Sequence, residues 1–216
     1  MRMETLEDLS DKLQAELSWR KNELFKLKTF IASSDVLKTI LLRSALSLLS
    51  AHFEGFVREA SGFYLLYVSA QKIKCQMLSG NFAVILLDTY FRKCKTTNKN
   101  SLRINLIDSY QNIQDTVFLI RKEELNQIIS MHSNPKMDVL DDLLSILGIE
   151  SDIFRLKKRY IEENLLRNRH KIVHGERYPV QYTDFIEILD KIVGLMDDYN
   201  DLILKSAEDQ CYIKKG

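Results

Sequence analysis

Glycine and proline are scarce in this chain of 216 residues, which contains seven Gly and two Pro. Both residues interrupt helices, so long stretches without them predict long helices. Near the start of the chain the apolar residues recur at intervals of three, four and seven: Leu6, Leu9, Leu13, Leu17, Leu24, Leu27 and Ile31. That spacing is typical of an amphipathic helix. We therefore expect an all-α fold, an up-and-down bundle of about five to seven helices.

The same reasoning predicts where the helices lie. We expect a single domain over residues 1–216, with a frayed tail from about residue 207. The expected helices span residues 4–31, 36–70, 82–94, 110–130, 138–147, 151–174 and 184–205. A short apolar piece, residues 102–107, precedes the fourth of them.

Local residues predict the helix ends. Residues 33–35 (Ser-Ser-Asp) supply N-cap chemistry for the second expected helix, and Asn81 does so for the third. Gly148 ends the fifth, and residues 132–135 (His-Ser-Asn-Pro) form a turn. The second expected helix is apolar on several faces, which indicates the centre of the bundle or an oligomer surface.

Charge is distributed unevenly although the formal net charge is only +1. Residues 72–103 contain seven cations against one carboxylate, and residues 155–171 contain seven against two. Residues 184–209 are correspondingly acidic. If the two basic stretches meet in space, they form a surface that attracts phosphate, as an RNA-binding protein requires. If they point apart, they are ordinary solubility charges.

The most reactive segment closes the most basic of the expected helices. Residues 166–176 read Leu-Arg-Asn-Arg-His-Lys-Ile-Val-His-Gly-Glu. Histidine gains or loses a proton near neutral pH and arginine binds phosphate, so the segment contains the groups that RNA cleavage without a metal ion needs. The alternative is a solvated basic helix end, where cations favour the helix dipole.

Helical geometry orders the side chains of this segment. At about 100° per residue, Arg167, His170 and His174 share one face of the helix, and Arg169 lies off it. Gly175 suits the left-handed position that stops a helix. We therefore expect His174 in the last helical turn, beside a loop, where reactive side chains reach solvent.

The segment from Arg169-His170 to His174 resembles the motif of the HEPN superfamily, an Arg, a polar residue and a His at a short spacing. Arg167-Asn168 to His174 fits the longer spacing of that motif equally well. Residues 42–58, which include Ala-His-Phe-Glu-Gly-Phe-Val, are similar to a segment of a stand-alone bacterial HEPN branch, as are residues 17–24. The chain departs from that branch at His170, where Asn is usual, and this departure leaves the register of the catalytic Arg open.

The resemblance implies a function. HEPN ribonucleases typically act as homodimers in which two motif helices face each other across a cleft. They cleave RNA without a metal ion, through attack of the 2′-hydroxyl on its own phosphodiester. In this chain His174 would be the general base or acid, Arg169 or Arg167 would stabilise charge on the phosphorane, and His170 or Asn168 would orient the phosphate.

Other residues are expected to support this site. Glu54 and His52 interrupt the apolar second helix. The resemblance implies that Glu54 orients an Arg or His of the motif, whereas the ordinary interpretation is a polar edge or a hydrogen-bonded core pair. For contacts with the RNA strand we expect the cations Lys171, Arg159, Lys95 and Lys99.

The remaining features narrow the setting. The three cysteines lack CxxC spacing, so we expect no disulfide framework, no metal and no cofactor. We expect a cytoplasmic protein without membrane contact, because no apolar run approaches about 20 residues. The resemblance implies a defence or toxin–antitoxin role, with RNA and an antitoxin or defence-system protein as partners. The alternatives are a non-catalytic HEPN module that binds nucleotide or a partner, and a helical scaffold without a ligand.

Overall fold

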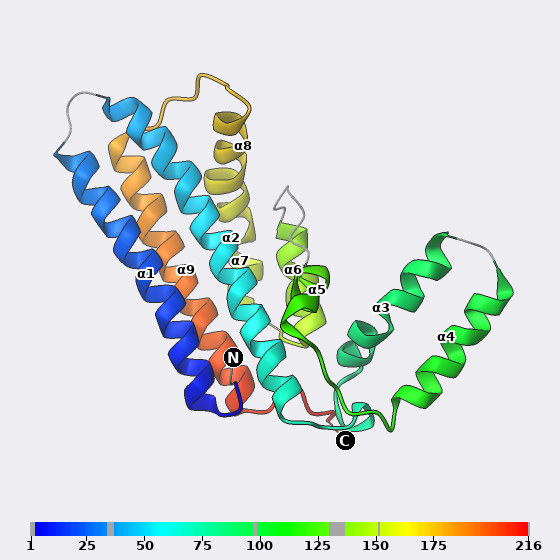
Figure 1. Ribbon diagram of the computed structural model, residues 1–216. Helices are drawn as coiled ribbons and strands as arrows, with labels where there is room; N and C mark the ends of the chain where they lie inside the picture. The colour runs from blue at the N-terminus through cyan, green and yellow to red at the C-terminus, as the bar shows by residue number, and fades with distance from the viewer. Residues whose placement is uncertain (1–2, 34–36, 97–98, 130–136, 151, 216) are drawn as a thin grey trace.

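The protein is all-α, as predicted (Figure 1). The computed structural model describes residues 3–33, 37–96, 99–129, 137–150 and 152–215. The helices in chain order are α1 (Leu6–Ala32), α2 (Lys38–Ala70), α3 (Gly80–Thr96), α4 (Asn100–Ile113), α5 (Leu125–Ile128), α6 (Met137–Leu147), α7 (Asp152–Tyr160), α8 (Arg167–Val173) and α9 (Tyr182–Glu208). More helical segments are present than predicted, because α5 is a separate short helix and the motif helix is divided into α7 and α8.

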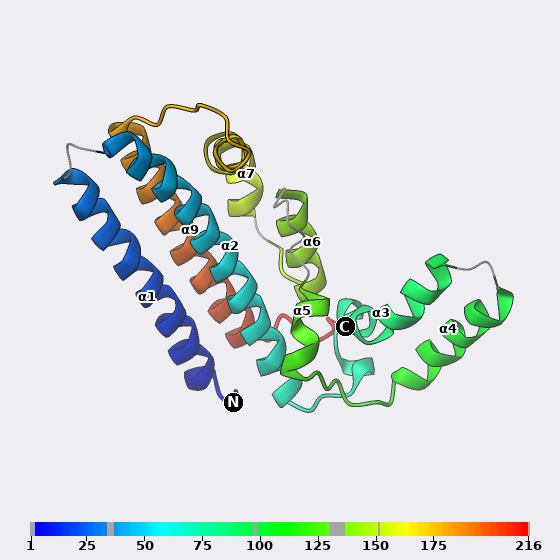
Figure 2. The ribbon, with the colours of Figure 1, turned by 45° about the horizontal axis from the view of Figure 1, so that its top comes forward.

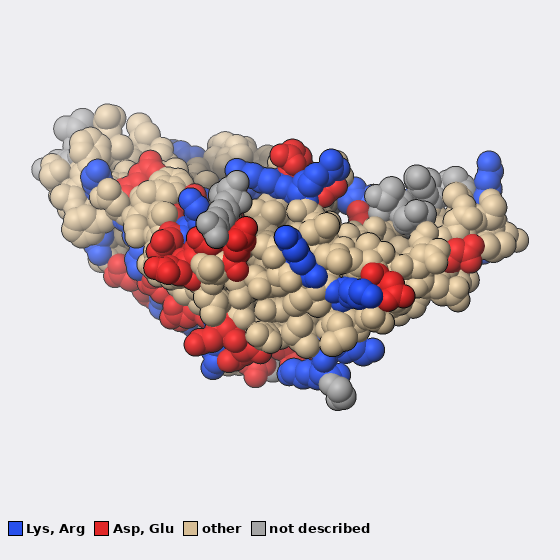
Figure 3. All heavy atoms as spheres, turned by 60° about the horizontal axis from the view of Figure 1, so that its bottom comes forward, with Lys and Arg blue, Asp and Glu red and all other residues tan. Residues whose placement is uncertain are grey.

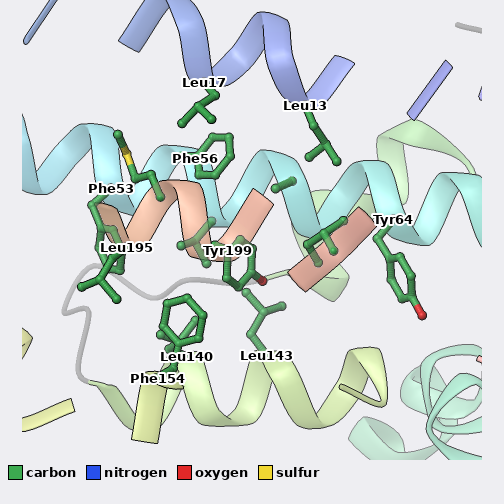
Figure 4. Packing of buried hydrophobic residues seen from close by; sticks show 14 of the residues in the cluster. Leu13, Leu17, Phe53, Phe56, Tyr64, Leu140, Leu143, Phe154, Leu195 and Tyr199 are labelled. Atoms are coloured by element: carbon green, nitrogen blue, oxygen red, sulfur yellow. The ribbon is translucent and has the colours of Figure 1, made fainter. Parts of the chain in front are cut away.

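Three long helices, α1, α2 and α9, lie side by side and build the core (Figures 1 and 2). α2 is buried on several faces because it also packs against α6 and α8. Figure 4 shows Leu13 of α1, Phe56 of α2 and Leu195 of α9 pointing into a common interior. The apolar character of α2 on several faces therefore reflects its central position, which was one of the two predicted explanations.

Tyr199 of α9 lies at the centre of this core. Its hydroxyl is 2.7 Å from Ser61 Oγ, so the buried polar group has a hydrogen-bond partner. Its ring meets the ring of Phe56 edge-on at 6.5 Å and that of Phe154 at 5.4 Å. Burial raises the pKa of the Tyr199 hydroxyl above its ordinary value. These contacts join α2, α7 and α9 through one side chain.

The helical rod that carries the motif consists of α7, a π-helical segment (Ile161–Leu166) and α8. Three of its apolar side chains, Phe154, Ile161 and Leu165, are fully buried. They dock the rod against α2 and α9. The exposed end of the rod is α8, so the fold presents the motif at the surface while its root is held by the core.

The α3–α4 hairpin extends away from the bundle like an arm (Figures 1 and 2). The prediction of a short apolar piece followed by a helix over residues 110–130 is wrong here, because α4 runs from Asn100 to Ile113. Residues 116–118 pair instead with residues 73–75, where Phe118 N–H donates to the Ile73 carbonyl at 2.9 Å. A short apolar run such as 117–120 is compatible with helix or extended chain, and tertiary pairing decided the outcome.

Asn81 is not the N-cap that the sequence predicted, because α3 already begins at Gly80. Its side chain instead ties α3 to the end of α6. The amide nitrogen donates to the Ile146 carbonyl at 2.7 Å, and the amide oxygen accepts from Ser79 Oγ at 2.6 Å. Gly148 follows α6 with a φ of 71°, which confirms its predicted role as the residue that ends this helix.

The tail after residue 207 is not frayed as predicted. Tyr212 is only 3% exposed, and its ring packs on those of Tyr64 and Tyr67. The Lys214 N–H donates to the Met77 carbonyl at 2.9 Å. The apolar Tyr212 and Ile213 therefore fasten the end of the chain beside the 3₁₀ turn Cys75–Met77.

Some predicted features fall outside the described ranges. These are Ser34 and Asp35 of the predicted N-cap, the predicted turn at residues 132–135, and Ser151, the first residue of the predicted motif helix. Among the described helices, α2 alone has the length and apolar composition of a membrane span, and 56% of that stretch is buried inside the protein.

Candidate active site at the end of helix α8

His174 is the first residue beyond α8 and caps its carboxyl end. Gly175 has a φ of 80°, as predicted for the residue that stops this helix. The Gly175 N–H donates to the Ile172 carbonyl at 3.1 Å, and the Glu176 N–H donates to the Lys171 carbonyl at 2.9 Å. This pair of bonds is the Schellman motif. It holds His174 at a defined helix end beside a loop.

His170 and His174 form a pair of exposed imidazoles. Their ring centroids are 4.2 Å apart and their planes are inclined by 50°. The spacing of four residues places them one helical turn apart on the same face. One chain therefore brings two exposed imidazoles together at the end of α8.

Both candidate arginines are available to a ligand. Arg167 is exposed and Arg169 is half-buried, and neither has a hydrogen bond or an ion pair within the described ranges. Arg167 precedes His170 by three residues and shares its face, as predicted. Arg169 precedes Val173 by four residues and so lies on the side of α8 that faces α2.

Asn168 is separated from the exposed cluster. It is only 8% exposed, and its side-chain amide donates to the Asn164 carbonyl at 2.8 Å. Asn164 likewise donates to the Tyr160 carbonyl at 3.0 Å. Both bonds occur at the π-helical segment, a type of segment that is frequent at functional sites. Of the two candidate polar residues, only His170 is presented with His174.

A groove of about 590 Å³ lies between α2 and α8, beside the motif. It is lined by Ile40, Arg43, Ser44, Ser47, Leu48, Ala51, Ile172 and Val173. Arg43 Nη2 donates to the Glu176 carbonyl at 2.8 Å and so ties the turn after His174 to α2. The sequence assigned no role to Arg43. The available signal was a single cation in an apolar part of the second helix, within the block that resembles the HEPN branch.

Replacement of Arg43 with Ala is expected to loosen this turn. Loss of one hydrogen bond costs about 1 kcal/mol, so amide hydrogen exchange at residues 174–178 should accelerate while the fold persists. Hydrogen exchange with mass spectrometry measures this effect. Arg58→Ala is the matched control, because Arg58 is an exposed cation of α2 whose contact is with the neighbouring Glu59. Equal exchange in both variants would contradict an anchoring role for Arg43.

Among the cations of the rod whose side chains the structure describes, those without a carboxylate partner are at the motif. On α7, Lys157 pairs with Asp198 at 3.0 Å, Lys158 with Asp141 at 2.9 Å, and Arg159 with Glu163 at 3.1 Å. Lys171 of α8 instead lies with Nζ 4.9 Å from the ring centroid of Tyr178. Lys171, Arg167 and Arg169 are thus three cations without carboxylate partners at this end of the rod.

The two basic stretches do not meet within one chain. Lys95 and Lys99 belong to the α3–α4 arm, which is separated from α8 by α5 and α6 in Figures 1 and 2. Figure 3, which views the lower end of the bundle, shows acidic side chains gathered on the side of α1 and α9 and basic ones scattered elsewhere. Contacts of Lys95, Lys99 and Arg159 with RNA remain predictions.

His52 is turned away from the motif, and Glu54 makes no hydrogen bond or ion pair with a motif residue within the described ranges. His52 is 5% exposed and faces α1, with Nε2 3.2 Å from a Glu23 carboxylate oxygen and its ring 5.2 Å from that of Trp19. Within the described ranges Glu54 makes its hydrogen bond with Ser50 Oγ, at 2.7 Å. Glu54 follows Ser47 and Ala51 of the groove lining by seven and three residues and so continues that face of α2, and its supporting role stays a prediction.

The two segments that resemble the HEPN branch outside the motif pack against each other. Arg20 of α1 is buried, ion-paired with Glu16, and stacked on the ring of Trp19 at 4.3 Å. A Cβ on Gly55 of α2 would lie 3.1 Å from Arg20 Nη2. Gly55 thus leaves room for the guanidinium of Arg20, and the pairing of these two segments builds the α1–α2 interface.

His52 gives the fold a pH dependence. Burial lowers the pKa of His52 below its ordinary value of 6.5, Glu23 opposes this effect, and Arg20 adds to it. The unfolded chain therefore binds a proton more readily than the folded protein, so the free energy of unfolding should fall as pH falls below about 6.5, by up to about 1.4 kcal/mol per unit. Urea unfolding between pH 5 and 7.5 measures the slope. His52→Gln should reduce it, and an unchanged slope would contradict this assignment.

The fold and the site together define an all-α protein that presents an Arg and His cluster at the end of a docked helix. The RiboL-PSP-HEPN family model matches residues 15–205, and the chain belongs to this family. No curated protein and no solved structure shows a significant match. The resemblance to the HEPN superfamily is thereby confirmed, and the family comprises nucleases or nucleotide-binding modules in general.

Proposed function

We propose that this protein is a metal-independent endoribonuclease. The observation that carries the proposal is the exposed His170–His174 pair, 4.2 Å between ring centroids, beside two arginines that have no partner within the described ranges. These groups are a proton donor, a proton acceptor and a phosphate ligand on one helix end. Membership in the RiboL-PSP-HEPN family supports RNA as the substrate, because HEPN domains are commonly ribonucleases.

In the proposed reaction the ribose 2′-hydroxyl attacks the adjacent phosphorus. His174 accepts the 2′-hydroxyl proton as general base, and a second imidazole, His170 or His174 of a second copy, protonates the departing 5′-oxygen. Arg169 stabilises the charge of the phosphorane. A bond from the 2′-oxygen to phosphorus forms and the bond to the 5′-oxygen breaks. The products are a 2′,3′-cyclic phosphate and a 5′-hydroxyl.

A homodimer through the motif face is part of the proposal. Ile40 is 59% exposed and Val173 is 56% exposed, and both line the groove beside the motif. Apolar side chains at such a surface favour association. An interface that places the same surface of both copies in contact would double the Arg and His cluster around one cleft. RNA-binding cations from both copies, Lys171 among them, would then flank the strand.

The register of the catalytic arginine is tested by comparing Arg169→Ala with Arg167→Ala. Burial of Asn168 favours the register Arg169-His170, so Arg169→Ala should lower kcat for RNA cleavage by about 10²- to 10³-fold. Arg167→Ala should lower kcat by less than about tenfold, because it removes a phosphate contact rather than the group at the phosphorane. Single-turnover cleavage of a labelled RNA measures both. The reverse order of effects would assign the longer register, Arg167-Asn168.

The alternative function is a non-catalytic HEPN module that binds nucleotide or a partner. The observation that favours it is His170, which stands where Asn is usual in the branch that the chain resembles. Wild-type protein that binds RNA without cleaving it would support this alternative.

The cellular setting that we propose is a defence or toxin–antitoxin system in the cytoplasm, with an antitoxin or defence-system protein as partner. Support comes from the usual setting of the family. Expression of the wild-type chain should arrest growth, and expression of His174→Ala should not. Arrest by both chains would count against a toxin whose action is cleavage.

A further inference from the structure

The α3–α4 arm presents an apolar stripe that is left exposed by the part of the chain that the structure describes. No residue of α4 is fully buried, and α4 packs mainly on α3. Ile104, Ile107 and Tyr110 are 58%, 59% and 53% exposed. Their spacing of three residues places each about 60° from the next, so they form an oblique stripe; Ile104 and Ile107 lie about 100° or more from the half-buried Leu102, Leu106 and Ile113, and Tyr110 lies at the edge nearer to them. A second apolar side on a protruding helix indicates a contact with another molecule.

A complementary groove lies at the lower end of the bundle. It occupies about 380 Å³ between the start of α1 and the end of α9 and is lined by Leu6, Glu7, Ser10, Asp11, Leu204 and Glu208. Leu6 is 39% exposed, so part of the lining is apolar. The carboxylates of Glu7, Asp11 and Glu208 have no hydrogen bond or ion pair within the described part of the chain. The groove therefore combines two apolar side chains, Leu6 and Leu204, with three carboxylates that have no partner within the described part of the chain.

Charge on the arm matches this groove. The arm contains the cations Lys95 and Arg103, which are exposed and have no partner among the described residues. Arg103 directly precedes Ile104 and lies on the same side of α4 as Tyr110. Asp108, the carboxylate of α4, lies about 100° round the helix from Ile107. The arm therefore has cations beside its apolar stripe, and the groove has carboxylates beside its apolar residues. The two surfaces are complementary in charge.

We propose that α4 of one copy of the chain docks into the α1–α9 groove of a second copy. Figure 1 shows α4 to the right of the bundle, apart from the lower ends of α1 and α9 whose residues line the groove, so the two surfaces would meet between copies and not within one chain. The contact joins two different surfaces and therefore leaves a free arm at one end and a free groove at the other. Repetition produces rings or filaments. This contact is separate from the motif face and does not depend on the proposed ribonuclease activity.

The test uses two variants, each of which lacks one half of the contact. Ile104→Glu/Ile107→Glu removes the arm, and Asp11→Lys/Glu208→Lys removes the groove. All four positions are exposed, so the fold should persist. Asn105→Glu is the matched control, because it adds a negative charge to an exposed side of α4 away from Ile107. Sedimentation velocity over a concentration series, at low and high salt, measures the mass of each protein.

The wild type and Asn105→Glu should gain mass with concentration, and salt should weaken the association by screening the charges. Each defective variant alone should keep a constant mass, whether monomer or motif-face dimer. Their equimolar mixture should exceed the mass of either, because the intact arm of one meets the intact groove of the other. A wild type of constant mass, or a mixture no heavier than its components, would overturn the proposal. RNA cleavage by the same variants, measured in parallel, reports separately on the proposed function.

Discussion

Replacement of His174 with Ala is expected to lower kcat for RNA cleavage by about 10²- to 10⁴-fold, the usual contribution of a general acid or base. The free energy of unfolding should stay within about 0.5 kcal/mol of wild type, because the imidazole is exposed beyond the end of α8 and contacts the equally exposed His170. Cleavage of a labelled RNA and urea unfolding measure the two quantities on the same preparation.

The matched control is Arg177→Ala, which removes an exposed cation three residues further along the same loop. Its kcat should remain within about threefold of wild type, because it belongs to neither register of the motif. If both variants cleave RNA at the wild-type rate, His174 is not the proton-transfer group. If both lose cleavage equally, the loop rather than the imidazole is responsible.

Phe154→Ala is expected to have the largest effect on stability, a loss of about 3–5 kcal/mol in the free energy of unfolding. The Phe154 side chain is fully buried and meets Tyr199 edge-on at 5.4 Å between ring centroids. Figure 4 shows it between α9 and Leu140 and Leu143 of α6. Its removal leaves a cavity where the rod that carries the motif joins the core.

Leu156→Ala is the control for this substitution, because Leu156 lies on the same helix but is 80% exposed. It should change the free energy of unfolding by less than about 0.5 kcal/mol. Urea unfolding monitored by circular dichroism compares the two variants. Equal losses, or none in either, would show that α7 is not docked on α9 through Phe154.

Local residue patterns predicted most of the helices. The apolar spacing of α1 and the glycines after α6 and α8 act through neighbouring residues, so the sequence contains their full signal. The arm and the tail were different. Residues 116–118 and Tyr212 obtain their conformation from segments far away in the chain, and a run of apolar residues does not identify such a partner.

The candidate site also has features that the sequence predicted and features that it did not. The spacing of four between His170 and His174 follows from helix geometry and was visible in the sequence. Two features were not visible. Asn168 is withdrawn from the cluster beside a π-helical segment, and Arg43 reaches the turn after His174 from a helix 133 residues away in the sequence. Each depends on how the rod docks, which is a property of the folded core.

Analysis of the ends of the RNA products in the presence of EDTA tests the proposed chemistry most directly. Mass spectrometry of RNA treated with the wild-type protein should find a 2′,3′-cyclic phosphate on one fragment and a 5′-hydroxyl on the other, and neither after treatment with His174→Ala. Fragments that appear only when a divalent cation is restored, or that carry a 3′-hydroxyl and a 5′-phosphate, would contradict it.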